Sequence, residues 1–364
     1  MTILLQKYLD YLPLDSISSI GSLGEGNTPL VESSYIGKEV GIPHLFFKSE
    51  HMNPTGSFKD RFAAVEVALM RQAGIRSFIA TSSGNTGSAL AAYSARHDIK
   101  CRIFINEITP ANKLTQMLIY GAKLFRVKGF GISEEKSRFI FQRLQALSEE
   151  CETRLVISAY EYSSAGMEGV KTIAYELVEQ MKGVPNLVFV PVGGGGLLTA
   201  IWRGFVDLKA QKLISVLPRI IAVQPRLNDT VVTPFFNGSL RAQAVATTTA
   251  VSGLAVQIDI DATRALQCVR ESEGSGVLVT DSASLEVQKE LCLREGLYVE
   301  PAGAVSVAGF LEAVAQRRVA PHEKVVCILS GHGFKDPASA SLIAEESDVE
   351  EVDLNQIKLS LFDC

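Results

Sequence analysis

The sequence contains few cysteines, and they do not form a metal-binding pattern. No two of the six cysteines are spaced as C-x-x-C, and the five histidines are equally dispersed, so no metal site is expected. We interpret the cysteines as reduced, mostly buried thiols of a cytoplasmic protein. They are Cys101, Cys151, Cys268, Cys292, Cys327 and Cys364.

Long apolar runs and a strong net charge are also missing. No apolar run approaches the roughly 18 residues that a membrane-spanning helix needs. The first residues do not show the basic and apolar regions of a secretory signal peptide. A formal net charge of −5 gives no reason to expect a nucleic acid or an anionic membrane as a partner. With 364 residues, the chain is long enough for one large or two modest domains.

Short runs rich in valine, isoleucine and phenylalanine alternate with helical patterns along most of the chain. This alternation predicts an α/β protein with mainly parallel sheets flanked by helices. The first twenty residues are expected to form a peripheral arm, residues 241–257 a loop near the site entrance, and residues 346–364 an acidic tail. Strands are expected within 44–50, 77–83, 101–107, 122–129, 187–193, 219–225 and 324–331, and helices over 57–72, 85–97 and 111–121 and from 197.

Two of the turns that follow these strands carry candidate chemistry in the first half of the chain. Lys59 begins a helical pattern in "NPTGSFKDR". The exposed N–H groups of a helix start lower the proton affinity of an amine, which suits a nucleophile, although a single lysine is more often a surface residue. The turn of "TSSGNTG" presents N–H groups and hydroxyls that suit a carboxylate, and an ordinary helix N-cap is the alternative.

Two further turns lie in the second half. Four consecutive glycines in "PVGGGGL" come between an apolar strand and a helix. They favour a phosphate cradle over a purely structural turn, and they match neither the ATP-binding nor the dinucleotide-binding glycine pattern. In "CILSGHGFKD", Ser330 ends a strand, so its hydroxyl points to the ligand-binding edge. His332 follows it, and we interpret this histidine as a structural hydrogen-bonding residue in preference to a catalytic base.

One ligand explains all four turns. Pyridoxal phosphate needs an amine for a Schiff base, an anion cradle, a partner for its ring nitrogen and a nearby site for an amino-acid carboxylate. A neutral hydroxyl at the ring nitrogen favours the unprotonated ring, which suits α,β-elimination better than transamination.

The motifs resemble those of the fold type II (tryptophan synthase β-like) pyridoxal-phosphate enzymes, and within them the threonine synthase group. The resemblance covers roughly residues 24–340 and is carried by "GEGNTPL", "KSEHMNPTGSFKDR", "TSSGNTGSALAAYSA", "EGLYVEPAGAVSVAGF" and "SGHGFKDP". It implies two open α/β domains with the cofactor in the cleft between them. Residues 1–50 and 161–345 would form the large cofactor-binding domain and 51–160 a smaller mobile domain. A homodimer is expected on the same basis.

The resemblance also implies roles for single residues. Lys59 would form the Schiff base and move protons, Phe58 would lie against the ring, and Asn85 would bond the phenolic oxygen. Ser330 would bond the ring nitrogen. The phosphate would be held by Gly193, Gly194, Gly195 and Gly196, and the substrate would be bound by Ser82, Ser83, Gly84, Thr86 and Ser163.

Two segments depart from the threonine synthase pattern. The phosphate loop "GGGGL" is similar to that of serine and threonine dehydratases. The segment "SSAGMEGVKT" has Ser163 and Gly166 where the group usually has an asparagine and an arginine that bind the substrate phosphate. A charge-assisted hydrogen bond contributes about 1.5–3 kcal/mol, and Lys113 or Arg61 could supply a replacement cation.

We therefore expect a pyridoxal-phosphate-dependent lyase or synthase that acts on the β or γ carbon of a small amino acid. Conversion of phosphohomoserine to threonine is the nearest family reaction. A serine/threonine dehydratase and a β-replacement synthase are the alternatives within this class. A cofactor-free regulatory relative is the alternative from a different class, and retention of Lys59 and the glycine cradle argues against it.

Overall fold

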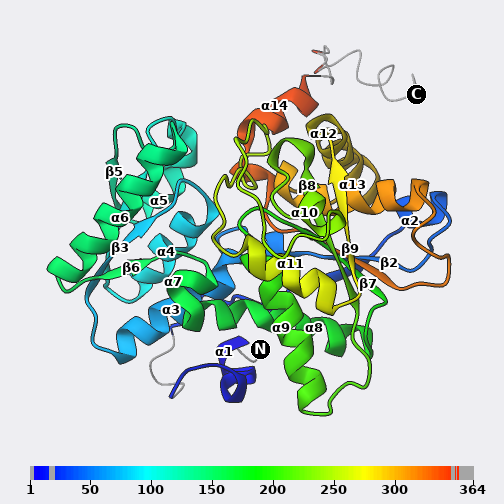
Figure 1. Cartoon of the computed structure of the whole chain (residues 1–364), viewed down its shortest axis with the longest axis horizontal. Helices are drawn as coiled ribbons and strands as arrows, with labels where there is room; N and C mark the ends of the chain where they lie inside the picture. Colours follow the sequence, from blue (N-terminus) through cyan, green and yellow to red (C-terminus); the bar gives the residue numbers. More distant parts are fainter. Residues whose placement is uncertain (1–3, 16–20, 346–348, 350, 352–364) are drawn as a thin grey trace.

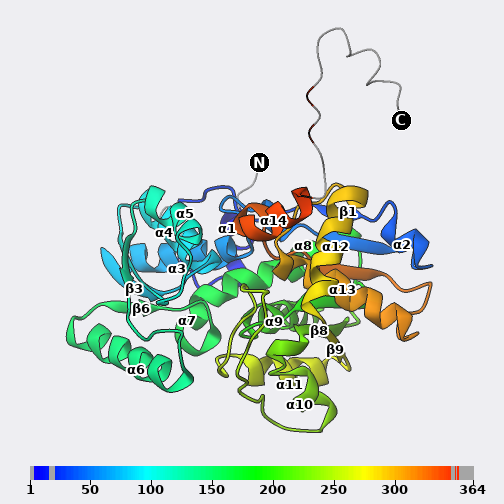
Figure 2. The same cartoon turned by 90° about the horizontal axis from the view of Figure 1, so that it is seen from above.

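Two sheets organise the molecule, each with helices packed against it (Figures 1 and 2). The computed structural model describes residues 4–15, 21–345, 349 and 351. The helices are α1 (Leu4–Lys7), α2 (Ile36–Glu39), α3 (Lys59–Gln72), α4 (Asn85–Arg96), α5 (Thr115–Ile119), α6 (Glu134–Glu150), α7 (Tyr160–Met167), α8 (Thr172–Met181), α9 (Gly196–Ala210), α10 (Val232–Phe236), α11 (Ala262–Glu271), α12 (Asp281–Glu290), α13 (Pro301–Ala315) and α14 (Pro337–Ala344). Short 3-10 or π turns are η1 (Leu9–Tyr11), η3 (Glu50–Met52), η4 (Ala111–Lys113), η5 (Glu168–Lys171), η6 (Arg226–Asn228), η7 (Leu291–Glu295) and η8 (Gly333–Lys335).

The larger sheet has six strands, all parallel except for one antiparallel edge strand, β1. Side chains alternate across it, as the period of a strand requires. Val188 and Val190 of β7 face the core beneath α8 and α9, whereas Leu187 and Phe189 face the core beneath α12 and α13. In spatial order the strands are β1 (Leu30–Glu32), β2 (Leu45–Lys48), β10 (Val325–Ile328), β7 (Leu187–Pro191), β8 (Arg219–Pro225) and β9 (Ser275–Val279).

The smaller sheet has four parallel strands and lies at the other end of the molecule (Figure 1). Helices α4 and α6 lie on its two sides (Figure 2). Its strands are, in spatial order, β5 (Lys123–Arg126), β4 (Lys100–Ile105), β3 (Ser77–Thr81) and β6 (Arg154–Val156). The predicted α/β fold with mainly parallel sheets flanked by helices is thus confirmed.

The N-terminal arm is packed more firmly than expected. Leu4, Tyr8 and Leu12 are buried in the same core cluster as the small sheet and helix α3. The rings of Tyr8 and Tyr175 lie 5.3 Å apart, which docks the arm on α8. The described part of the arm is thus anchored on the core, because its apolar residues recur at helical spacing and cover an apolar face. Residues 16–20 and most of the acidic tail lie outside the described residues.

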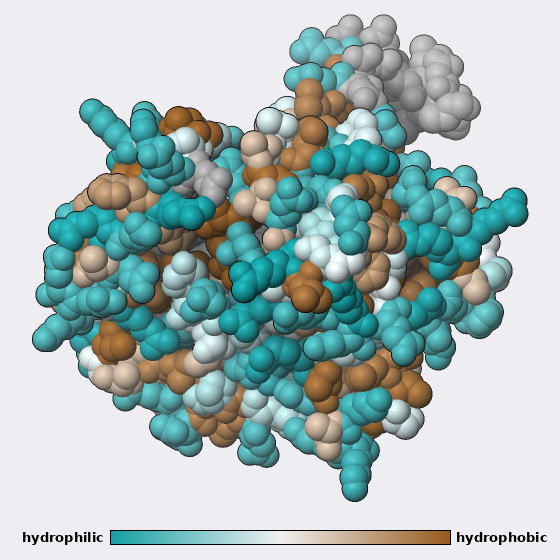
Figure 3. All heavy atoms as spheres, viewed as in Figure 1, coloured by the Kyte–Doolittle hydropathy of each residue, from teal (hydrophilic) through white to brown (hydrophobic). Residues whose placement is uncertain are grey.

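Other predicted elements differ in detail. The helix expected over 111–121 is divided into η4 and the five-residue helix α5. The small-residue segment 241–257 is irregular, as expected, and its Leu254 would lie 3.1 Å from a Cβ added at Gly193. Within the described ranges no helix is long and apolar enough to cross a membrane. The face in Figure 3 is mostly hydrophilic, with small scattered hydrophobic patches.

Candidate active site

Lys59 is the first residue of α3, and it is partly buried. Its Nζ donates a hydrogen bond to Ser158 Oγ over 2.7 Å and lies 4.6 Å from the centre of the Phe58 ring. Burial lowers the pKa of Lys59 to about 8, partly opposed by the negative charge of Asp261. An amine with this pKa is neutral in a useful fraction of molecules near neutral pH, which a nucleophilic or proton-transferring lysine requires.

Ser158 joins three of the predicted turns, although the sequence did not identify it. Its Oγ contacts Lys59 Nζ and lies 2.7 Å from Thr86 Oγ1. Its carbonyl oxygen would lie 3.6 Å from a Cβ placed on Gly196. Ser158 follows strand β6 by two residues, so a hydroxyl after a short strand was the only signal available. We call the segment that ends at Lys59 the lysine turn, residues 81–87 the asparagine turn and residues 193–196 the glycine turn. All three therefore meet at Ser158.

The glycine turn, residues 193–196, fills the gap between β7 and the 15-residue helix α9. Gly195 has φ +96°, a conformation that side-chain-bearing residues rarely adopt, and a Cβ there would lie 2.4 Å from the carbonyl oxygen of Asp261. Asp261 N in turn donates to the carbonyl oxygen of Gly194 over 2.9 Å. These contacts hold the turn in place at the start of α9, and no side chain of the turn covers its backbone. The N–H groups and the helix dipole at this position favour an anion.

The asparagine turn uses its serine hydroxyls to hold its own shape. Ser82 Oγ accepts from Gly87 N over 2.9 Å, and Ser83 Oγ accepts from Asn106 N over 3.1 Å. A Cβ on Gly84 would meet nothing within 4 Å, so the backbone there borders open space. That this turn binds a substrate carboxylate remains a prediction. Because the serine hydroxyls are already used, the backbone N–H groups are the better candidates for that binding.

Asn85 connects this turn to Glu300, the residue that precedes helix α13. Its Nδ2 donates to Glu300 Oε1 over 2.8 Å, and a Cβ on Gly331 would lie 2.0 Å from the same oxygen. Burial raises the pKa of Glu300 to about 7, although Lys335 and Asn85 act to lower it. The segment around Glu300 belongs to a quoted motif, but the sequence assigned this carboxyl no role.

Ser330 lies at the carboxyl end of β10, where it was expected. The residue is buried, and its carbonyl oxygen accepts from Phe58 N over 3.1 Å. Ser57 and Gly331 form a bridge between the same two segments. His332 Nδ1 accepts from Phe334 N over 3.2 Å and its ring stacks on Phe334, which supports the structural interpretation of this histidine.

The segment that departs from the threonine synthase pattern is tightly packed. Ser163 is buried, and its Oγ accepts from Ile157 N over 3.4 Å. A Cβ on Gly166 would lie 2.4 Å from Glu66 Oε2 and 2.9 Å from Phe62 Cε2. No side chain fits at position 166 unless helix α3 moves, so the absent arginine has no space there.

The two cations considered as substitutes have different surroundings. Arg61 is fully buried and bonds Glu50 and Glu176, each over 2.7 Å, so it is not available to a substrate. Lys113 remains partly exposed, with Nζ 3.6 Å from Asp336 Oδ2 and bonded to Ser252 Oγ. Of the two, only Lys113 keeps exposed surface that a substrate can contact.

Comparison with known proteins agrees with this geometry. A family model described as "Pyridoxal-phosphate dependent enzyme" matches residues 21–331, which is most of the chain. The chain belongs to this family. It is 36% identical to a threonine synthase of Methanocaldococcus jannaschii over 358 residues, which covers 97% of this chain and 85% of that protein.

Solved structures place this pyridoxal-phosphate enzyme among related folds. Maize serine racemase superposes with a TM-score of 0.71 at 25% identity, covering 93% of this chain and 92% of the other. The serine racemase of Dictyostelium discoideum gives a TM-score of 0.68 at 25% identity, covering 84% of this chain and 92% of the other. The protein is therefore a threonine synthase-like, pyridoxal-phosphate-dependent enzyme.

The residues present fit this cofactor. A glycine turn at a helix start suits its phosphate, and Lys59 is a partly buried amine of lowered pKa suited to its aldehyde. The Phe58 ring lies near that amine, Phe58 N donates to the carbonyl oxygen of Ser330, and Asn85 donates to Glu300. The described residues contain no group of side chains that could hold a metal ion.

Proposed function

We propose that this enzyme catalyses elimination, or elimination followed by replacement, at the β or γ carbon of a small amino acid. The observation that carries the proposal is the Lys59 amine bonded to Ser158, which also contacts the asparagine turn and lies beside the glycine turn, while the neighbouring Phe58 contacts Ser330. Similarity to threonine synthases over nearly the whole chain supports a reaction of that type, with conversion of phosphohomoserine to threonine as its nearest example.

The chain supplies proton transfer and orientation. When bound, pyridoxal phosphate stabilises the electron pair left on the substrate when its α-proton is removed. Lys59 Nζ takes that proton and returns one later, which its pKa of about 8 permits. Ser158 Oγ holds the amine in place and links it to Thr86, beside the proposed carboxylate site. Glu300 fixes Asn85 across the cleft.

The remaining groups bind and orient. The N–H groups of residues 193–196 would hold the phosphate of pyridoxal phosphate, Ser330 Oγ would bond its ring nitrogen, and the Phe58 ring would pack against its ring. The backbone around Gly84 receives the substrate carboxylate. We propose a Schiff base to Lys59, which borohydride reduction followed by peptide mass spectrometry tests. A reduced cofactor on Lys59 is expected, and a modification on another lysine would contradict the assignment.

A serine/threonine dehydratase reaction is the second candidate. Gly166 leaves no space for a phosphate-binding arginine, and Arg61 is engaged in buried ion pairs. The four-glycine turn is also dehydratase-like. Together these observations favour a substrate without a distal phosphate.

The two candidates are separated by one set of assays. Purified holoenzyme is incubated in turn with phosphohomoserine, threonine, serine and phosphoserine, and released phosphate, keto acids and new amino acids are measured. Phosphate together with threonine indicates the synthase reaction. Keto acid from threonine or serine indicates the dehydratase. Turnover of none of these substrates would contradict both.

We also propose the division into a domain of residues 1–50 and 161–345 and a mobile domain of residues 51–160. The composition of the two sheets supports it, because the smaller sheet uses only residues 77–156. A homodimer in the cytoplasm is proposed from the family resemblance and from the free thiols among the described residues. Light scattering of the purified holoenzyme tests the dimer, and a monomeric mass would exclude it.

A further inference from the structure

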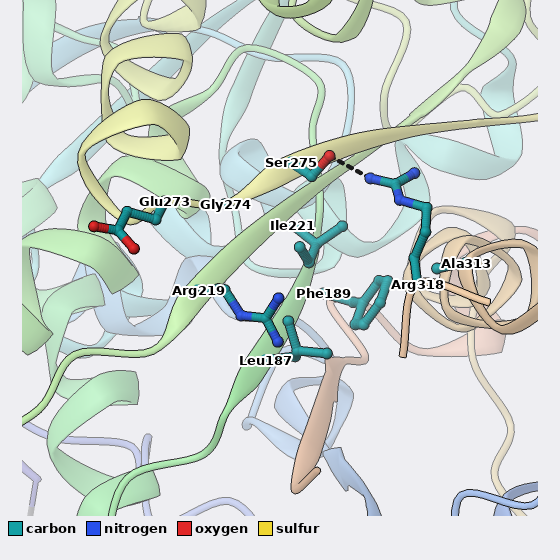
Figure 4. Close-up of a pocket in the computed structure, with 9 residues that line it drawn as sticks. All are labelled: Leu187, Phe189, Arg219, Ile221, Glu273, Gly274, Ser275, Ala313 and Arg318. Carbon is teal, nitrogen blue, oxygen red and sulfur yellow. Dashed lines mark hydrogen bonds between the residues drawn. The ribbon is translucent and has the colours of Figure 1, made fainter. Parts of the chain in front are cut away.

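A cavity lies at the amino ends of strands in the large sheet, away from Lys59 (Figure 4). Its lining includes the first residues of three neighbouring parallel strands, namely Leu187 of β7, Arg219 of β8 and Ser275 of β9. The glycine turn and Ser330 follow the other, carboxyl ends of this sheet. A strand rises about 3.3 Å per residue, so the five residues of β7 separate the two sites by roughly 15 Å.

The cavity has an apolar floor that is already formed. Phe189 and Ile221 lie between the two arginines in Figure 4, and Ala313 of α13 adds to the lining. The Phe189 ring packs edge-on against Phe310 with centres 5.8 Å apart, so its position is fixed by the core. The cavity volume is about 270 Å³. This space suits the apolar part of a small molecule.

The wall of the cavity carries an uncompensated positive charge. Arg318 donates to Gly276 O over 3.2 Å, to Gln316 Oε1 over 3.1 Å and to Ser275 Oγ, all of them neutral acceptors. Among the described residues no carboxylate pairs with Arg318. Burial lowers the pKa of Arg318 from its ordinary value, as expected for a cation without a counterion.

None of the other charges around the cavity pairs with Arg318 among the described residues. Arg219 is paired with Glu323, so the two together are neutral. Glu273 lines the rim, but its carboxylate points away from the other labelled side chains in Figure 4. One unpaired guanidinium above an apolar floor matches a ligand with one negative charge and an apolar body. A phosphate dianion would need a second unpaired cation and would gain nothing from the apolar floor.

We propose that this cavity binds a small monocarboxylate with an apolar body, with its carboxylate on Arg318 and its apolar part over Phe189 and Ile221. The planar guanidinium suits a carboxylate in particular. Because the site lies at the far end of β7 from the glycine turn, a ligand there leaves the Lys59 site open. The inference therefore does not rest on the proposed reaction.

The test uses the full-length holoenzyme and 3-phenylpropionate as the probe. Isothermal titration measures its binding beside that of the neutral 3-phenylpropionamide and of inorganic phosphate. Saturable one-to-one binding of the acid, without measurable binding of the amide or of phosphate, is expected. No saturable binding of the acid, or tighter binding of phosphate, would overturn the proposal.

Two variants locate the bound acid. Arg318→Gln should weaken its binding at least about tenfold, equivalent to about 1.4 kcal/mol, whereas Arg317→Gln, which removes the same charge from an exposed neighbour, should not. Ala313→Leu, which narrows the cavity without changing its charge, should also weaken binding. Unaltered binding to Arg318→Gln would place the acid elsewhere, for example in the Lys59 cleft, and refute the proposal. Should Arg318→Gln not fold, Ala313→Leu alone decides between these outcomes.

Discussion

Replacing Arg61 by methionine should destabilise the fold strongly, because Arg61 neutralises two buried glutamates. Its guanidinium makes two hydrogen bonds to Glu50, both over 2.7 Å, and two to Glu176, over 2.7 and 2.8 Å. Removing one partner of a buried ion pair costs about 3–5 kcal/mol, because the remaining charges lose their compensation. We expect a loss of this size in the free energy of unfolding of Arg61→Met at pH 7.

The loss should depend on pH in a defined direction. Burial alone would raise the pKa of Glu176, but Arg61 and Lys48 lower it to about 2, below its unfolded value. A carboxyl with a lowered pKa stabilises the fold above its unfolded pKa of about 4.3, and this contribution, about 3 kcal/mol, disappears as the pH falls toward 2. The difference between wild type and Arg61→Met should therefore shrink at acidic pH.

Urea unfolding followed by circular dichroism at pH 7 and pH 3 measures both effects. Arg76→Gln, an exposed charge just after α3, is the control and should change stability by less than about 0.5 kcal/mol. A loss below about 1 kcal/mol for Arg61→Met, or a loss that is the same at both pH values, would refute this reasoning. A large loss of substrate affinity with unchanged stability would show instead that Arg61 serves the substrate.

Three further changes test the site directly. Lys59→Ala should abolish turnover and the cofactor absorbance near 410 nm, a rough value for a lysine–pyridoxal imine, while circular dichroism stays unchanged; an active variant would contradict the role of Lys59. Gly195→Ala places a side chain at φ +96°, with its Cβ 2.4 Å from Asp261 O, and should weaken cofactor binding at least about tenfold in a titration of the apoenzyme, so retained affinity counts against the cradle. Burial raises the pKa of Glu300 to about 7, so ionising this carboxyl costs the apoenzyme about 2 kcal/mol as the pH rises from 5 to 7. Glu300→Gln should remove this decline in melting temperature, and equal slopes for both proteins would show that Glu300 does not titrate there.

The turns of the site could be predicted because each is a local feature. A glycine run between an apolar strand and a helix, or a lysine at a helix start, depends on neighbours in the chain, and parallel strands bring such turns to one edge of a sheet. Lys59, Asn85, the four glycines and Ser330 follow from this reasoning, and the structure brings their segments together.

Contacts between distant segments could not be predicted in the same way. Ser158 lies 99 residues from Lys59, and Glu300 lies 215 residues from Asn85. The residues around Ser158 and around Glu300 do not indicate a role for either side chain. For Arg61 the sequence suggested a role that the structure does not support. Its place near the lysine turn suggested a substrate contact, whereas it forms buried ion pairs with Glu50 of η3 and Glu176 of α8.

The sequence by itself determined the α/β class, the positions of most strands along the chain and the turns proposed to carry the chemistry, since these depend on periodicity and on local backbone requirements. The tertiary structure alone decided which charges are neutralised, which hydroxyl meets Lys59, and that position 166 has no space for a side chain. Burial and distance set these properties, and both depend on residues that are far apart in the chain and close together only after folding.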